Sequence, residues 1–363
     1  MQDPVLPALD GASVAGIVPA LLGGRDRVWI PEPARDASAV VLLVLDGVGW
    51  NAVQEHAAVV PTLMSMQGGP ITTVVPSTTS TALTSICTGL APAQHGILGY
   101  RMLVEGAVLN VLRWTNGSKP PDPFDVQRHP AFLGREVAAV TKSEFRNTSF
   151  TQAHQRGAKF VGWSTTAVIV EHVSRLIASG DRFVYAYYPG VDTVAHEYGL
   201  HEEFYTRELA FADRLVGDLL DALPSDAALL VTADHGQVHL DRDNWFDLDE
   251  LTPLVECMAG DARFRYLHAR PGAAPELVQA ARDLCGAHAW VRSRAEVLAE
   301  GWIGAGATGS IPGRLGDVVL ASRDATAFVD PALPVEVRLR SGHGSLTPDE
   351  MWVPLLAASG RGA

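Results

Sequence analysis

The 363-residue chain has little cysteine, little lysine and a deficit of positive charge. Its three cysteines, Cys87, Cys257 and Cys285, are far apart and odd in number, which excludes a disulfide scaffold and a zinc module built on paired cysteines. Only three of its 28 basic residues are lysines. We interpret this bias as the base composition of a GC-rich genome and not as a functional signal.

The deficit of positive charge narrows the range of partners. With 28 basic and 41 acidic residues, the chain has a formal net charge of −13. Such a surface repels phosphate backbones and anionic lipids, so we expect neither binding to a nucleic-acid polymer nor attachment to a membrane. A small phosphorylated substrate is compatible with this charge if bound cations supply positive charge locally.

Long apolar runs are missing as well. No stretch reaches about 18 uninterrupted apolar residues, the length that a transmembrane helix needs. The N-terminus has no basic start, and Asp3, Pro4, Asp10 and Gly11 stand where a signal peptide would be apolar. We therefore expect a cytoplasmic protein. Nothing in the sequence indicates an oligomeric state.

Instead, the chain contains short apolar runs that end in polar residues. Residues 39–45 stop at Asp46, residues 182–188 stop shortly before Asp192, and residues 227–233 stop at Asp234. Continuous apolar runs of this length are typical of strands buried on both faces. Helix-like stretches such as 201–221 lie between them, so we predict an α/β fold with a mostly parallel sheet, flanked by helices. Ligands bind such sheets beyond the carboxyl ends of the strands.

Two segments interrupt this alternation. Residues 101–153 contain a patch rich in proline, asparagine and glycine at 115–123, and we interpret them as an insertion near the site. Residues 246–310 are predicted to form a smaller α+β cap. The catalytic core would then comprise residues 1–245 and 311–363, and the chain would return to it at 317–321.

Several of the polar residues are of the types that bind metals. Asp192 and His196 are four residues apart, so one helical turn places both on one face. A carboxylate with an imidazole suits Zn²⁺ or Mn²⁺ better than Ca²⁺. Each fragment alone also fits a simpler role: a surface hydrogen-bonded pair, a turn at Asp234-His235-Gly236 or a glycine loop around His343. The complete set favours a metal site over these alternatives.

Five segments, taken in order, resemble the alkaline phosphatase superfamily, and most closely its nucleotide pyrophosphatase/phosphodiesterase branch. They are VLLVLDGVG (41–49), VPSTTSTALTSICTGLAPAQHGILGY (75–100), GVDTVAHEYG (190–199), TADHG (232–236) and GHGS (342–345). The resemblance covers about residues 40–345. It implies an alkaline-phosphatase-like core and two divalent metal ions, most often zinc, with manganese as the alternative.

The resemblance also implies a role for each matching residue. One metal is expected on Asp192, His196 and His343, and the second on Asp46, Asp234 and His235. The nucleophile aligns with Thr79, whose oxygen should also contact the second metal. Thr78 is the alternative if the alignment is displaced by one residue.

One position departs from the branch. Animal-type members carry an asparagine that donates to a phosphate oxygen, and Tyr100 falls at that position here. Either Tyr100 or Arg101 is expected to bind substrate in its place, unless another group holds the phosphate oxygen. A guanidinium at the phosphate would favour a monoester, because it binds two free oxygens at once.

The function that this pattern favours is a two-metal hydrolase. It would cleave phosphodiester or pyrophosphate bonds of small, nucleotide-like substrates through a phospho-threonine intermediate. A phosphomonoesterase, a phosphonate hydrolase and a phosphosugar mutase on the same site are the alternatives, and a binding protein without catalysis is a further one.

Four other residues could have either a structural or a functional role, and the structural role is favoured for each: His95, Trp114, Phe150 and Trp163. His239 could line the pocket, but a place on the surface is favoured.

Overall fold

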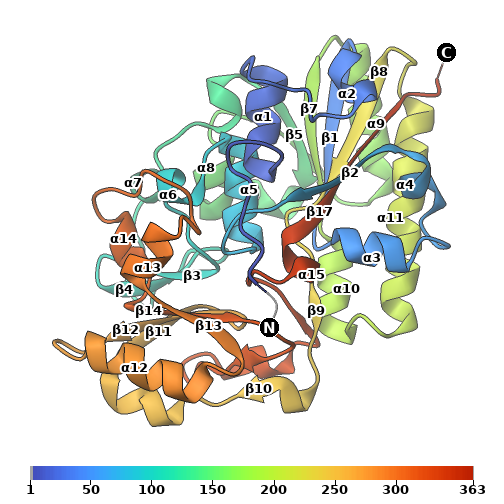
Figure 1. Ribbon diagram of the computed structural model, residues 1–363. Coiled ribbons are helices and arrows are strands. Elements are labelled where there is room, and N and C mark those ends of the chain that lie inside the picture. The colour runs from blue at the N-terminus through green and yellow to red at the C-terminus, as the bar shows by residue number, and fades with distance from the viewer. Residues whose placement is uncertain (1–2, 363) are drawn as a thin grey trace.

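A computed structural model describes residues 3–362. The protein is built around a seven-stranded sheet (Figure 1). In spatial order its strands are β2 (Gln67–Thr72), β17 (Trp352–Ser359), β8 (Ala227–Thr232), β1 (Ala39–Leu45), β7 (Phe183–Tyr188), β5 (Ala138–Lys142) and β6 (Lys159–Trp163). Six of them run in one direction, and only β17 runs against its two neighbours. The predicted α/β fold with a mostly parallel sheet is confirmed.

The three central strands are apolar throughout because helices cover both faces of the sheet. Every residue of β1, β7 and β8 is buried. On one face α1 (Val14–Leu22) packs against α5 (Thr79–Thr88), and on the other α9 (Ala167–Ala178) packs against α11 (Glu203–Ala222) (Figure 1). The helix predicted over 201–221 is α11. No helix within residues 3–362 has the length and apolar character to cross a membrane.

Shorter helices connect these elements. They are α2 (Glu32–Asp36), α3 (Trp50–Glu55), α4 (Pro61–Ser65), α6 (Pro92–His95), α7 (Pro123–Val126), α8 (Ser149–His154), α10 (Gly190–Tyr198), α13 (Arg294–Ala299), α14 (Ile311–Arg314) and α15 (Pro348–Met351). The helix α10 follows β7 directly, so it starts at the carboxyl edge of the sheet. Since β8, β1 and β7 are neighbours, the residues that follow all three strands meet at that edge.

A second, smaller unit lies below the sheet edge in Figure 1. Its antiparallel sheet has the order β11 (Val255–Asp261), β12 (Phe264–Ala269), β14 (Val318–Ser322) and β13 (Ala289–Ser293), and α12 (Ala274–Cys285) packs on it. Its apolar cluster includes Leu267, Leu277 and Leu320. We expected the chain to return to the core at 317–321, but this segment is β14 and pairs with β12 and β13.

The segment 101–153 differs from the expected insertion in one respect. It begins with a hairpin of β3 (Arg101–Val104) and β4 (Ala107–Asn110), and β3 packs against β11 of the small sheet. Residues 138–142, however, form β5, which pairs in parallel with β6 and β7 of the central sheet. The part that lies outside the sheet therefore ends before residue 138.

One buried ion pair joins the small unit to the core. Arg263, in the turn between β11 and β12, donates two hydrogen bonds of 2.8 Å to Glu350 of α15, and both side chains are fully buried. Glu350 also accepts from the backbone N–H of Ser345 at 3.0 Å. Because removal of one partner leaves the other charge unpaired in the interior, this pair constrains how the two units meet.

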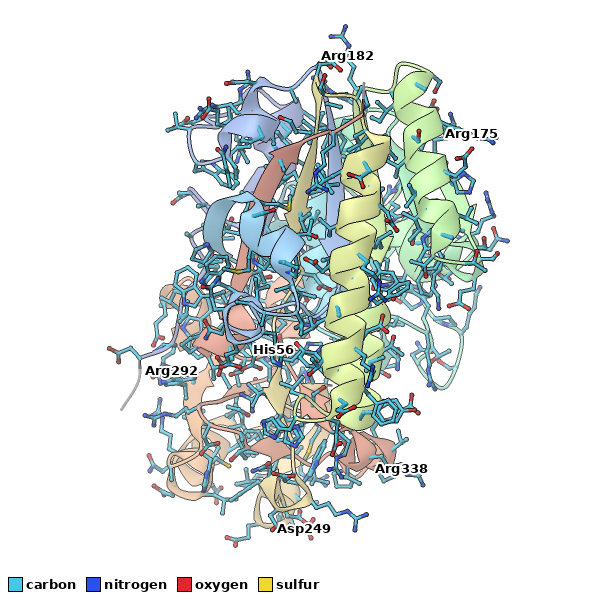
Figure 2. All side chains as sticks on the ribbon, turned by 90° about the vertical axis from the view of Figure 1, so that its right-hand side faces the viewer. His56, Arg175, Arg182, Asp249, Arg292 and Arg338 are labelled. Atoms are coloured by element: carbon cyan, nitrogen blue, oxygen red, sulfur yellow. The ribbon has the colours of Figure 1, made fainter. Side chains whose placement is uncertain are left out.

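We predict that Glu350→Gln lowers the free energy of unfolding by about 3–5 kcal/mol, the range for breaking a buried pair. The matched control is Glu171→Gln, which breaks an ion pair with Arg175 on the surface of α9 (Figure 2). The Glu171 and Arg175 side chains are 60% and 77% exposed, so the loss there should stay below about 0.5 kcal/mol. Urea denaturation measures both, and equal losses would contradict the prediction.

Candidate active site

The first cluster of metal-binding side chains comes from α10 and from the loop after β16 (Ser341–Gly342). Asp192 and His196 lie on one face of α10, as their spacing predicts, and His343 faces them from the loop. His196 Nε2 is 3.3 Å from Asp192 Oδ1 and 3.2 Å from His343 Nε2. Ligand atoms of the three residues lie within 4.8 Å of one another, which is close enough for one cation.

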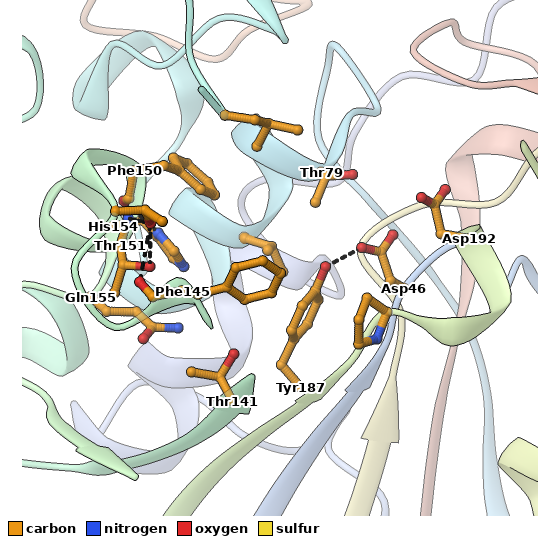
Figure 3. A pocket seen from close by; sticks show the side chains of 14 residues that line it. Asp46, Thr79, Thr141, Phe145, Phe150, Thr151, His154, Gln155, Tyr187 and Asp192 are labelled. Carbon is orange, nitrogen blue, oxygen red and sulfur yellow. Dashed lines mark hydrogen bonds between the residues drawn. The ribbon is translucent and has the colours of Figure 1, made fainter. Parts of the chain in front are cut away.

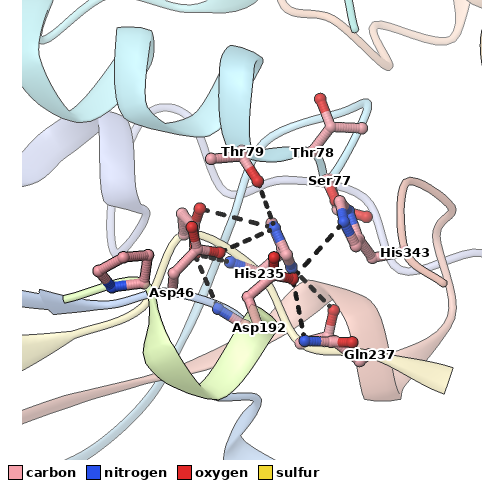
Figure 4. Close-up of polar contacts among 12 residues, drawn as sticks. Asp46, Ser77, Thr78, Thr79, Asp192, His235, Gln237 and His343 are labelled. Atoms are coloured by element: carbon pink, nitrogen blue, oxygen red, sulfur yellow. Dashed lines mark hydrogen bonds and ion pairs between the residues drawn. The ribbon is translucent and has the colours of Figure 1, made fainter. Parts of the chain in front are cut away.

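The second cluster lies at the ends of β1 and β8. His235 Nε2 is 3.5 Å from Asp46 Oδ1 and 3.5 Å from Asp234 Oδ2. Atoms of Asp46, Asp192 and His235 also fall within 4.8 Å of one another. Asp192 thus stands between the two clusters, and the imidazole rings of His235 and His343 stack with their centroids 3.6 Å apart (Figure 4). The two clusters are therefore side by side.

Backbone carbonyls fix which ring nitrogen of each histidine is available. His196 Nδ1 lies 3.0 Å from the carbonyl oxygen of Ser341. His235 Nδ1 lies 3.1 Å from the carbonyl oxygen of Gly236, and His343 Nδ1 lies 3.1 Å from that of Ser77. A carbonyl only accepts, so Nδ1 carries the proton and Nε2 presents a lone pair to the cluster. Burial, with His235 and His196 nearby, lowers the pKa of His343 far below its ordinary value and keeps this ring neutral.

Two buried carboxylate oxygens have no hydrogen-bond partner within the described residues: Asp46 Oδ1 and Asp234 Oδ2. The other oxygen of each is held, by the Tyr187 hydroxyl for Asp46 and by the backbone N–H groups of Gly47 and His235 for Asp234. Burial and mutual repulsion raise the pKa of Asp46 well above its ordinary value, and burial raises that of Asp234. Both free oxygens face His235 Nε2, so a cation there would satisfy all three atoms.

Thr79 reaches the second cluster and Thr78 does not. Thr79 is the first residue of α5, and its Oγ1 lies 3.1 Å from His235 Nε2 (Figure 4). The Thr78 hydroxyl is buried and turns toward its own helix, 3.2 Å from Thr81 Oγ1 and 3.4 Å from Ser80 Oγ. The backbone N–H groups of the first turn of α5 point toward the same region, where the helix dipole favours an anion.

Tyr100 and Arg101 have different places. Tyr100 lines a cavity beside the first cluster, and its hydroxyl accepts from Asn110 at 2.7 Å. Arg101 is buried and forms an ion pair with Asp330, so it is held away from the clusters. The reason is the alternation of side chains where β3 begins, which sends consecutive residues to opposite faces.

Two cavities open on Thr79 and Asp192. The first, of 240 Å³, lies against α8 and is lined mainly by apolar groups, among them Phe145, Phe150 and Tyr187 (Figure 3); we call it the aromatic cavity. Its other lining residues are Asp46, Thr79, Leu83, Leu112, Thr141, Thr148, Thr151, His154, Gln155, Pro189 and Asp192. Phe150 is therefore at the site, whereas Trp114 and Trp163 are buried and line neither cavity.

The second cavity, of 330 Å³, lies toward the small unit, and we call it the cap cavity. It is lined by Thr78, Thr79, Ser80, Tyr100, Leu112, Arg113, Asp192, His196, Asp261, Ala262, Leu333, Val335, Glu336, Leu339, Gly342 and His343. Only this cavity includes His196 and His343 among its walls. The two cavities thus approach the paired clusters from different sides.

Some residues at the site carry no signal in the sequence. Gln237 donates to Asp192 Oδ1 at 3.0 Å and accepts from the Ser341 hydroxyl at 2.5 Å, and Tyr187 binds Asp46 from inside a strand. Tyr187 stands in an apolar run, so nothing in the neighbouring sequence marks it as a site residue.

His95 lies in the interior, with a ring nitrogen 2.9 Å from Ser85 Oγ, and burial lowers its pKa to about 3. This position fits a structural role.

His239 also lies apart from the clusters. Its ring stacks on His201 at 4.1 Å, and its Nδ1 accepts from the backbone N–H of Leu200 at 3.1 Å. It lines neither of the two cavities described above.

We predict that Asp46→Asn changes stability in opposite directions with and without metal. In metal-free protein it should raise Tm by a few degrees, because it removes one of the mutually repelling carboxylates. The gain should grow with pH, since a carboxyl with a raised pKa in the folded state loses stability as pH rises through that pKa. In zinc-loaded protein the variant should lower Tm, because a ligand is lost.

Thermal denaturation with excess chelator and with excess zinc measures this reversal. The exposed Asp36→Asn, which removes the same charge elsewhere, should change Tm little in either condition. An equal gain in Tm for Asp46→Asn with chelator and with zinc would count against a cation at the second cluster.

Comparison with known proteins finds solved structures of the same fold. Murine ectonucleotide pyrophosphatase/phosphodiesterase 5 superimposes with a TM-score of 0.68 at 15% identity, covering 90% of this chain and 88% of that one. The human protein gives 0.68 at 14%, and an inactive variant of the murine protein in complex with AMP gives 0.67 at 14%, each covering 88% of this chain and 87% of the other.

These likenesses show a shared fold. No curated protein matches the chain significantly. Residues 40–346 match the sequence family described as type I phosphodiesterase / nucleotide pyrophosphatase. This match extends over most of the chain and contains both clusters and Thr79, and the chain therefore belongs to the type I phosphodiesterase / nucleotide pyrophosphatase family.

Proposed function

We propose that the protein hydrolyses phosphodiester or pyrophosphate bonds of small, nucleotide-like substrates, with Thr79 as nucleophile. Two divalent cations, zinc or manganese, would be held by Asp192, His196 and His343 and by Asp46, Asp234 and His235. The observation that carries the proposal is the place of Thr79 Oγ1, 3.1 Å from His235 Nε2 where both cavities meet. When bound, the cations would activate the hydroxyl and neutralise charge on the phosphoryl group.

The chain's own groups account for the order of bond changes. Thr79 Oγ loses its proton and attacks phosphorus, and the bond to the leaving oxygen breaks. That oxygen takes the electron pair and is protonated from solvent, and a phospho-threonine ester remains. Water then attacks this ester: its hydroxyl joins the phosphorus of the released product, and Thr79 Oγ takes up a proton again. Free N–H groups in the first turn of α5 are placed to donate to a phosphoryl oxygen during both steps.

The aromatic cavity supports a substrate with a flat apolar part. Phe145, Phe150 and Tyr187 offer ring surfaces beside Thr79, and Thr141 and Gln155 add polar atoms (Figure 3). Such a mixture suits a nucleobase, which stacks on aromatic rings and hydrogen-bonds at its edge. That a related murine protein is described in complex with AMP agrees with this choice.

The place of Arg101 favours diester or pyrophosphate substrates over the alternatives. A monoesterase would use a guanidinium at the phosphate to bind two free oxygens. Arg101 is committed to Asp330, and Arg113 is the only arginine that lines either cavity. The phosphomonoesterase, phosphonate hydrolase and phosphosugar mutase are therefore weaker candidates for this site.

We predict that Thr79→Ala lowers kcat by at least roughly 10³, as loss of a covalent nucleophile generally does. Thr79→Ser should keep partial activity, because the hydroxyl stays while the methyl that restricts its rotamer is lost. Metal content should be nearly unchanged in both, since three protein ligands remain at the second cluster. Steady-state kinetics and elemental analysis measure these effects.

Thr78→Ala is the matched control and should keep most of kcat, because its hydroxyl faces Thr81 and not the clusters. If instead Thr78→Ala were inactive and Thr79→Ala active with both metals bound, the nucleophile would be assigned one residue too late.

We also predict that the metal-loaded protein prefers diesters. Its kcat/KM for bis-p-nitrophenyl phosphate should exceed that for p-nitrophenyl phosphate by about tenfold or more, because Arg101 is held by Asp330 and the exposed Arg113 is not fixed at the clusters to compensate the second charge of the monoester. Thr79→Ala provides the blank for contaminating phosphatases. A higher kcat/KM for the monoester would favour the phosphomonoesterase.

A further inference from the structure

The cap cavity has a defined position relative to the direction of attack. In an in-line displacement the attacking and leaving oxygens stand on opposite sides of phosphorus. Thr79 Oγ1 lies 3.1 Å from His235 Nε2 of the second cluster. A leaving oxygen on the opposite side of phosphorus would point away from His235, and we place it toward the neighbouring first cluster. His196 and His343 of that cluster line the cap cavity and not the aromatic cavity. The group that departs would therefore occupy the cap cavity, while the retained part lies in the aromatic cavity.

Asp261 is the residue of the cap cavity that the metal clusters do not explain. It is the last residue of β11 and is only 8% exposed. A Cβ added to Gly344, the neighbour of His343, would lie 3.3 Å from Asp261 Cβ and 3.4 Å from the Thr78 methyl. Asp261 is therefore beside both loops that form the site. Its Oδ2 accepts from the backbone N–H of Tyr100 at 3.2 Å.

The two arginines near Asp261 each have an acidic partner elsewhere, while Nε and Nη1 of Arg265 have no hydrogen-bond partner within the described residues. Arg265 donates to Glu336 at 2.7 Å, and Arg101 is paired with Asp330. Within residues 3–362 Asp261 makes no ion pair, and its Oδ1 has no hydrogen-bond partner of its own. Arg113 lines the cavity but is exposed. A buried carboxyl of this kind is a free hydrogen-bonding group at the wall of the cavity.

Burial raises the pKa of Asp261 to about 7, with a smaller contribution from Glu336, whereas the Tyr100 N–H, Arg265 and Arg101 lower it. In its ionised form the group accepts hydrogen bonds and repels anions, so the test is made on the alkaline side of neutrality. A hydroxyl or ammonium group in the cavity would supply the missing partner, and a phosphate would not.

We propose that the cap cavity is the subsite for the departing group and that Asp261 binds a hydroxyl or ammonium group there. The protein then takes phosphodiesters of hydroxylated or amino alcohols in preference to substrates whose leaving group is itself a phosphate. This inference rests on the proposed hydrolysis at Thr79. It selects the diester from the two bond types that the proposed function names.

The test uses the full-length, metal-loaded protein at about pH 8 and four substrates that share adenosine 5′-phosphate as the retained part. Three are its esters with ethanol, ethylene glycol and ethanolamine, and the fourth is ATP, whose leaving group is pyrophosphate. The glycol and ethanolamine esters should exceed the ethyl ester in kcat/KM by about tenfold or more, the effect of a hydrogen bond to a charged group. Because the three alcohols also differ in acidity, the share of this difference that is due to Asp261 is the share that Asp261→Asn removes.

Asp261→Asn should remove most of that advantage and raise kcat/KM for ATP several-fold, each value being measured relative to the ethyl ester cleaved by the same variant. Circular dichroism and elemental analysis show whether the variant is folded and keeps its metals. Glu256→Gln, which removes one charge from an exposed position of the same strand, is the matched control and should alter none of the four values.

Equal kcat/KM for the three esters, or an equal change in all four substrates in Asp261→Asn, would overturn the inference and leave the proposed function intact. Failure of the wild-type protein to cleave any of the four substrates or bis-p-nitrophenyl phosphate would reject the proposed function itself, and the inference with it.

Discussion

Repulsion among three carboxylates is the constraint on which the rest of the site depends. Asp46, Asp192 and Asp234 follow three strands that are neighbours in the sheet, and the strands are buried on both faces. The acids therefore cannot move apart without disturbing the core. Tyr187 and backbone N–H groups bind one oxygen of Asp46 and of Asp234 and leave the other free. A cation between the acids would offset this repulsion, so we expect metal binding to stabilise the folded protein.

The carboxyl edge of the sheet could be predicted from sequence, whereas pairing over long distances could not. Apolar runs that stop at Asp46 and Asp234 indicated buried strands with polar ends, and the spacing of Asp192 and His196 indicated a shared helix face. The small sheet uses an apolar strand of the same kind, so nothing local shows that 318–322 pairs there. Nor can a sequence pattern reveal that Arg101 has a partner 229 residues away in Asp330.

The two cavities beside Thr79 are formed by different units of the fold. The walls of the aromatic cavity come from the core, largely from the segment around β5 and α8. The cap cavity includes residues of the small unit and of the segment 333–339. Asp46, Asp234 and His235 follow strands of the central sheet, and Asp192 and His196 lie on the helix that follows β7, so packing of the core fixes their positions. A change of substrate in this family could therefore arise in the small unit without a change in the reacting groups.

The reversed strand β17 has a consequence for the order in which the protein forms during synthesis. It lies between β2 and β8, and β2 is joined to the rest of the sheet only through it. Until residues 352–359 have left the ribosome, β2 has no neighbouring strand and β8 has an open edge. An open apolar edge is a site where nascent chains associate. The central sheet is thus completed among the last steps of folding, although most of its strands are synthesised early.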